Sequence, residues 1–93
     1  MGNNGEVINR AILRSDLPGE YAPGVPIVEI AGYSRVLIEN HMGVCAYGRD
    51  RICVKVHYGI LSVSGSCLEL ARMNRYQIVI TGKIDSVTID AKR

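Results

Sequence analysis

From Val25 onward, apolar and polar residues alternate with a period of two, which is typical of strands that bury one face. The chain has five tyrosines but neither phenylalanine nor tryptophan, so its core must be built from Val, Ile and Leu, which suit a pleated surface. The alternation predicts an all-β domain with strands near 27–31, 35–39, 43–47, 51–57, 60–64, 67–71, 77–81 and 86–90.

Four glycines recur along this part of the chain at intervals of sixteen or seventeen residues: Gly32, Gly48, Gly65 and Gly82. Apolar pairs at a spacing of two flank each of them: Val28 and Ile30, Val36 and Ile38, Val44 and Ala46, Ile52 and Val54, Leu61 and Val63, Leu68 and Leu70, Ile78 and Ile80, and Val87 and Ile89. This internal repeat predicts four units that share one core. Two of the glycines, Gly65 and Gly82, fall inside strand-like runs, where glycine usually marks a bulge or a sharp corner.

Two architectures satisfy the repeat. The one we favour is a β-solenoid or roll in which each repeat of 16–17 residues is one coil, with the glycines at its corners. The alternative is an antiparallel meander folded into a small sandwich. In both, residues 25–93 form the β domain and residues 1–24 precede it.

The first part of the chain has a different pattern. Residues 6–15 carry Ile8, Ala11 and Ile12 at helical spacing, which predicts a short amphipathic helix. Three prolines within 18–26 indicate a linker after it. The helix could cover an open end of the β domain, pack on a sheet face, or lie on a membrane surface. Packing on its own domain is favoured, because short helices usually need tertiary contacts.

One predicted turn has a more distinctive sequence than the others. Residues 39–43 read Glu39-Asn40-His41-Met42-Gly43, in which Asn and Gly supply left-handed backbone for a tight reversal. Similar turns are expected at 48–51 and at 57–59.

Charge and cysteine content exclude several classes of protein. The net charge is only +2 and the basic residues are scattered among acids, which is unlike the concentrated basic face of a nucleic-acid binder. The three cysteines include no C-x-x-C pair, and we expect them to be reduced thiols of a cytoplasmic protein without a cofactor. We see no secretion signal and no apolar run of the roughly 20 residues that span a bilayer.

Catalytic and metal sites have little support in the sequence. The candidate residues are the two histidines and the three cysteines: His41, His57, Cys45, Cys53 and Cys67. The run His41-x-x-x-Cys45 is not a zinc signature, and nothing in the sequence sets a base beside a cysteine nucleophile. We therefore predict no enzyme and no metal site, and keep a small metal- or ligand-binding enzyme as the alternative.

Two motifs are distinctive as sequences. Residues 26–32 read P-I-V-E-I-A-G and residues 38–44 read I-E-N-H-M-G-V. Residues 59–65 and 78–87 also combine alternating aliphatic residues with a glycine. In these motifs the chain resembles the YabP/YqfC family of sporulation proteins from endospore-forming bacteria, and the YqfC branch in particular.

The resemblance implies a non-enzymatic role in spore envelope or coat development, in the mother-cell cytoplasm. Expected partners are a second copy of the chain or a membrane-bound sporulation protein. The N-terminal helix could add a peripheral contact with the forespore membrane. Glu39, Asn40 and His41 are the candidate partner contact, although the same residues also suit a turn whose Asn40 and Gly43 are needed for backbone shape.

Overall fold

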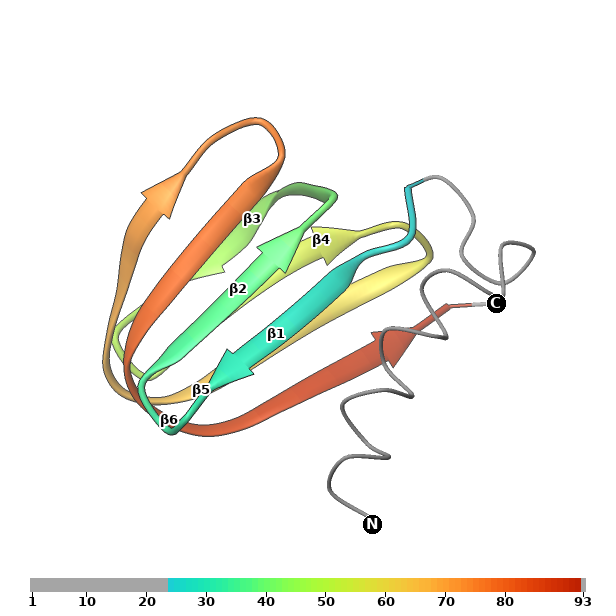
Figure 1. Cartoon of the computed structure of the whole chain (residues 1–93). Helices are drawn as coiled ribbons and strands as arrows, with labels where there is room; N and C mark the ends of the chain where they lie inside the picture. The colour runs from blue at the N-terminus through green and yellow to red at the C-terminus, as the bar shows by residue number, and fades with distance from the viewer. Residues whose placement is uncertain (1–23, 93) are drawn as a thin grey trace, which may run out of the picture.

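The structure is a computed structural model, and it describes residues 24–92. Its six strands are β1 (Ile27–Ala31), β2 (Arg35–Glu39), β3 (His41–Tyr47), β4 (Arg51–Val56), β5 (Gly59–Met73) and β6 (Gln77–Ala91). They form one sheet in the order β1-β2-β6-β5-β4-β3, and every neighbouring pair is antiparallel. Figure 1 shows the sheet curving so that β1 and β2 lie in front of β3 and β4.

The prediction of an all-β fold is confirmed, and the first two strands have the predicted bounds. The later prediction of four short strands is wrong. The runs 60–64 and 67–71 belong to one strand, β5, and the runs 77–81 and 86–90 belong to β6. A solenoid is not the arrangement of residues 24–92, since stacked coils would pair in parallel and these strands return as hairpins. The predicted N-terminal helix lies outside the described residues.

The two long strands change neighbours along their length. The first part of β5 pairs with β4, and its last part pairs only with β6. The first part of β6 pairs with β2 over 77–81, and its last part pairs only with β5. The sheet therefore has two halves: β1 and β2 with residues 77–81 of β6, and β3 and β4 with residues 59–64 of β5.

The core lies between these halves. Val36 and Ile38 of β2 belong to the same buried cluster as Ile52 and Val54 of β4, although β2 and β4 are not neighbours in the sheet. The other members are Val56, Leu61, Val63, Leu68, Ile78 and Ile80. Fully burying one such side chain stabilises a fold by about 1.5–3 kcal/mol, so this cluster is the main source of stability. Most of the apolar pairs of the sequence repeat are in it or packed against it.

The four regularly spaced glycines lie at two corners of the sheet. Gly82 has φ +135°, and its N–H donates to Ser34 O, in the β1–β2 turn that also holds Gly32. At the other corner, the Gly65 N–H donates to Asp50 O, in the β3–β4 turn that follows Gly48. The pairing of β5 with β6 shifts register beside Gly65 and again opposite Gly82. Each corner thus joins one hairpin turn to one bend in a long strand.

Candidate functional site

The candidate partner contact, residues 39–41, forms the connection between β2 and β3. Asn40 has φ +64°, a left-handed conformation that asparagine tolerates better than most residues. Its backbone N–H donates to Tyr76 O at 2.8 Å, and its side-chain Nδ2 donates to Val25 O at 2.9 Å. This one residue therefore ties the connection both to the β5–β6 loop and to the segment that leads into β1.

The side chain of His41 bonds at both ring nitrogens. Nδ1 accepts from the Gly43 N–H at 2.9 Å, and Nε2 lies 2.7 Å from Asn74 O. A carbonyl oxygen only accepts, so the ring is the neutral tautomer with its proton on Nε2. Beside it, Gln77 Nε2 donates to Glu39 Oε2 at 3.1 Å.

The β5–β6 loop is itself ordered by Asn74. Its Oδ1 accepts from the backbone N–H of Tyr76 and of Gln77, both at 2.8 Å. Residues 39–41 therefore bond to a loop with a fixed shape. Their hydrogen bonds are made inside the fold, which gives these side chains a structural role; a partner contact at the same place stays a prediction.

Replacing Asn40 separates its two structural contributions. Asn40→Ala removes the hydrogen bond to Val25 O. It also leaves alanine at a positive φ, which an L-residue other than glycine, asparagine or aspartate rarely adopts. We therefore expect the free energy of unfolding to fall by about 2 kcal/mol. Asn40→Gly removes only the side-chain bond, and we expect about 1 kcal/mol or less. Urea unfolding followed by circular dichroism measures both. Equal losses in the two variants would contradict the role of the left-handed backbone.

The structure does not assemble the alternative site of histidines and cysteines. No group of three or more His, Cys, Asp or Glu residues in the described part of the chain is placed to hold a metal ion. Cys53 is buried with its Sγ 3.5 Å from Ser62 Oγ, whereas Cys45 and Cys67 are exposed. The His57 ring lies against Tyr58, with centroids 3.9 Å apart. Within residues 24–92, every buried side-chain nitrogen or oxygen has a hydrogen-bond partner.

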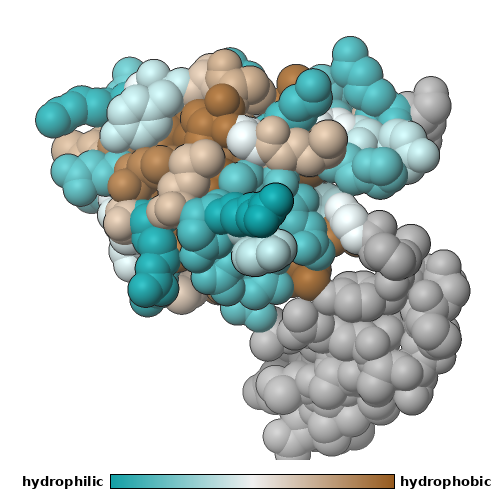
Figure 2. Space-filling view, turned by 90° about the horizontal axis from the view of Figure 1, so that it is seen from above, coloured by the Kyte–Doolittle hydropathy of each residue, from teal (hydrophilic) through white to brown (hydrophobic). Residues whose placement is uncertain are grey.

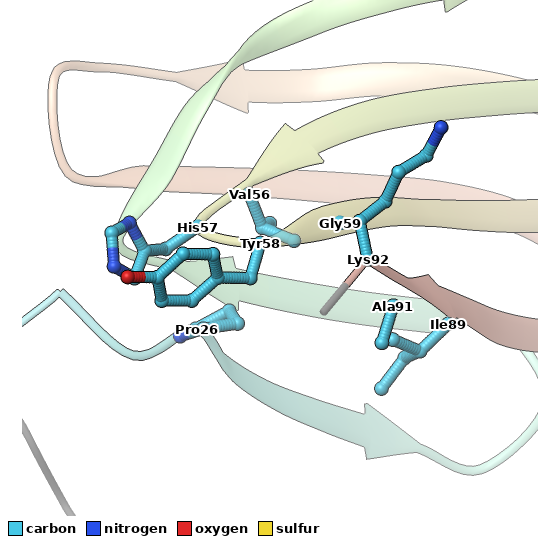
Figure 3. Close-up of a pocket in the computed structure, with 8 residues that line it drawn as sticks. All are labelled: Pro26, Val56, His57, Tyr58, Gly59, Ile89, Ala91 and Lys92. Carbon is cyan, nitrogen blue, oxygen red and sulfur yellow. The ribbon is translucent and has the colours of Figure 1, made fainter.

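Sequence reasoning missed an apolar groove at one end of the fold. The groove has a volume of about 440 Å³, and Figure 3 shows its walls. It is lined mainly by Pro26 before β1, Val56 and Tyr58 around the β4–β5 turn, and Ile89 and Ala91 near the end of β6. These residues come from three separate segments, so no local pattern could have brought them together.

Other exposed aromatic side chains are dispersed. Tyr33, Tyr47 and Tyr76 are exposed in or next to hairpin turns. Figure 2 shows hydrophobic and hydrophilic residues interspersed on the face that it presents. Among residues 24–92 there is no helix of the length and apolar character needed to cross a membrane.

Comparisons with known proteins give one match. The model of the YabP family matches residues 25–93, a range that includes all six strands of the described residues. No curated protein and no solved structure matches the chain.

Proposed function

Because the chain belongs to the YabP family, which is associated with sporulation and is not a known enzyme family, we propose that it acts without catalysis in spore envelope or coat development. The mechanism that we propose is association through an open strand edge, in the mother cell. The partner is a second copy of the chain or a membrane-associated sporulation protein. A peptide or strand that adds to a sheet edge gains main-chain hydrogen bonds there.

The observation that carries this proposal is the last part of β6. Residues 84–91 pair with β5 on one side, while β2 pairs with β6 only over residues 77–81. Beyond Ile84, whose N–H donates to Tyr33 O, no strand among the described residues pairs with the other side of this segment. Figure 1 shows it running along the outside of the fold. Such an edge is a ready template for another strand.

The edge at β3 is less suited to this role. Its pairing with β4 shifts register twice, between His41 and Val44 and between Val44 and Ala46. Gly43, which lies between His41 and Val44, has φ +112°. Bulges of this kind twist an edge away from regular pairing, so β3 is protected where the last part of β6 is not.

A lysine on the β6 edge tests the mechanism. Thr88 is exposed in the open segment, and edge lysines are a known way to prevent strand pairing. We expect Thr88→Lys to weaken self-association, or binding to the membrane-associated partner, by about tenfold, with a stability change within about 0.5 kcal/mol. Sedimentation velocity over a range of concentrations measures self-association.

Ser34→Lys is the matched control, because it adds the same charge on the exposed β1–β2 turn, which bonds to β6 at Gly82 and lies outside the open segment that holds Thr88. Equal weakening in both variants would indicate a general charge effect and reject the edge. If the chain is strictly monomeric and does not bind anionic vesicles, both self-assembly and membrane contact are rejected as mechanisms.

The biological role has a separate test. Deleting the gene in the sporulating host should lower the yield of heat-resistant spores, and the wild-type gene should restore it. The Thr88→Lys gene should restore the yield less well than the Ser34→Lys gene. A wild-type spore yield after deletion would reject the proposed role.

A further inference from the structure

We propose that the apolar groove at the end of the fold is the docking site for residues 6–15 of the same chain. This inference goes beyond the proposed function and does not depend on it, since it concerns contacts within one molecule. The groove lies between the segment that enters β1 and the last residues of β6 (Figure 3).

The groove exposes a residue that belongs to the core face. Ile89 of β6 stands directly opposite Leu61 of β5, so the two side chains point to the same side of the sheet. Leu61 is fully buried, yet 63% of Ile89 is exposed. Val87, two residues earlier on the same face, is partly buried against the core. The core face of β6 is thus covered at Val87 and uncovered at Ile89.

The edge strand β1 also has a core-face side chain that is exposed. Ile30 stands opposite the fully buried Val36, but 55% of Ile30 is exposed. Its predecessor on that face, Val28, is partly buried against the core. The sequence repeat places Ile30 and Ile89 in core positions, but only Ile89 lines the groove; Ile30 lies at the end of β1 that is farther from Pro26. An aliphatic side chain that follows the core pattern but is exposed, as Ile89 is, indicates that another part of the protein packs on the groove.

Residues 6–15 fit this site by chemistry and by connection. Ile8, Ala11 and Ile12 form an apolar stripe at helical spacing, which needs an apolar surface to bury it. The described fold begins at Gly24, only two residues before Pro26 of the groove wall. The eight residues 16–23 reach at most about 26–29 Å when extended, so the segment is tethered close to the groove.

The tether also favours this occupant over a second copy. A short linker gives a joined segment an effective concentration in roughly the millimolar range, far above the micromolar concentrations at which a protein is usually studied. Intramolecular docking therefore prevails over the same contact made between two molecules, unless the linker cannot reach.

A tryptophan reporter tests the docking in the full-length chain. The chain has no tryptophan, so Ile89→Trp adds the single one, at a largely exposed position that should accept it. We expect its fluorescence to show a blue-shifted maximum and weak quenching by acrylamide. Adding Ile8→Asp and Ile12→Asp should shift the maximum to the red and raise the quenching constant at least twofold. Tyr58→Trp, on the same groove, is the second reporter.

Two controls make the result specific. Tyr33→Trp, at a corner where 87% of the side chain is exposed, should respond to neither aspartate. Arg10→Ala with Arg14→Ala, off the apolar stripe, should leave both groove reporters blue-shifted. Groove reporters that are already exposed in the parent chain, or that do not respond to the aspartates, would overturn the proposal. So would a response that appears only as the protein concentration rises, because the segment would then dock on a second copy.

Discussion

Replacing Gly65 with alanine is expected to lower the free energy of unfolding by about 3 kcal/mol. An added Cβ at this position would lie 1.8 Å from Lys83 O and 2.9 Å from Lys83 C. Both are backbone atoms of the strand paired with β5, so no side-chain rotation can relieve the overlap. The strands must move apart at the corner, and the Gly65 N–H bond to Asp50 O would be strained with them.

Gly82 lies at the other corner, on β6, and its replacement gives a second test of the same kind. Its added Cβ would lie 2.5 Å from Cys67 O, and its φ of +135° is rarely adopted by residues with a side chain. We expect Gly82→Ala to cost as much as Gly65→Ala, about 3 kcal/mol.

Gly48→Ala is the control on the same series of glycines. Its Cβ would meet only Arg51 O, at 3.4 Å, so a loss below about 1 kcal/mol is expected. Urea unfolding of the three variants, with a constant denaturant slope, measures the differences. Similar losses at all three positions would show that the close approach of β5 and β6 does not set the requirement for glycine.

Much of this fold could be predicted from the sequence, because alternation depends only on neighbouring residues. The period of two placed β1, β2 and most of the buried aliphatic residues. The glycine spacing pointed to corners. It could not show that the strand continues through each corner, because a bulge interrupts the alternation without ending the hairpin. Nor could it choose between solenoid and hairpins, since alternation on one strand says nothing about which strand pairs with it.

The candidate site was predictable only in part, for a similar reason. Turn chemistry identified Asn40 as a residue suited to left-handed backbone, which it adopts. Its bond to Val25, and that of His41 to Asn74, join residues 15 and 33 positions apart. The first bond spans the β1–β2 hairpin, and the second requires β6 to pair with β2. The groove at Ile89 also joins residues that are far apart in the chain, and therefore had no signal in any short stretch of sequence.

The second large effect is expected at Leu68, which fills the core next to the bend of β5. The residue before it, Cys67, has φ +53°, and the Leu68 N–H donates to Arg49 O at 2.9 Å. This geometry turns the Leu68 side chain inward, where it is fully buried in the main cluster. Leu68→Ala would leave a cavity enclosed by strands that the corners hold in place. We expect a loss of about 3–4 kcal/mol, within the usual range for a buried leucine.

Leu37→Ala makes the same chemical change at a half-buried position of β2, on the face opposite Val36 and Ile38. A site open to solvent leaves little cavity, so a loss of about 1 kcal/mol is expected there. Thermal and urea unfolding of the two variants give the comparison. If Leu68→Ala lowered the free energy of unfolding no more than Leu37→Ala, the core would have to adjust to a cavity beside the corner. In that case the corner glycines would not hold the two halves of the sheet at a fixed distance. A large difference, together with a large loss in Gly65→Ala, would show that the fold needs both the core packing at Leu68 and the close backbone approach at the corner; non-additive losses in the double variant would show that the two depend on each other.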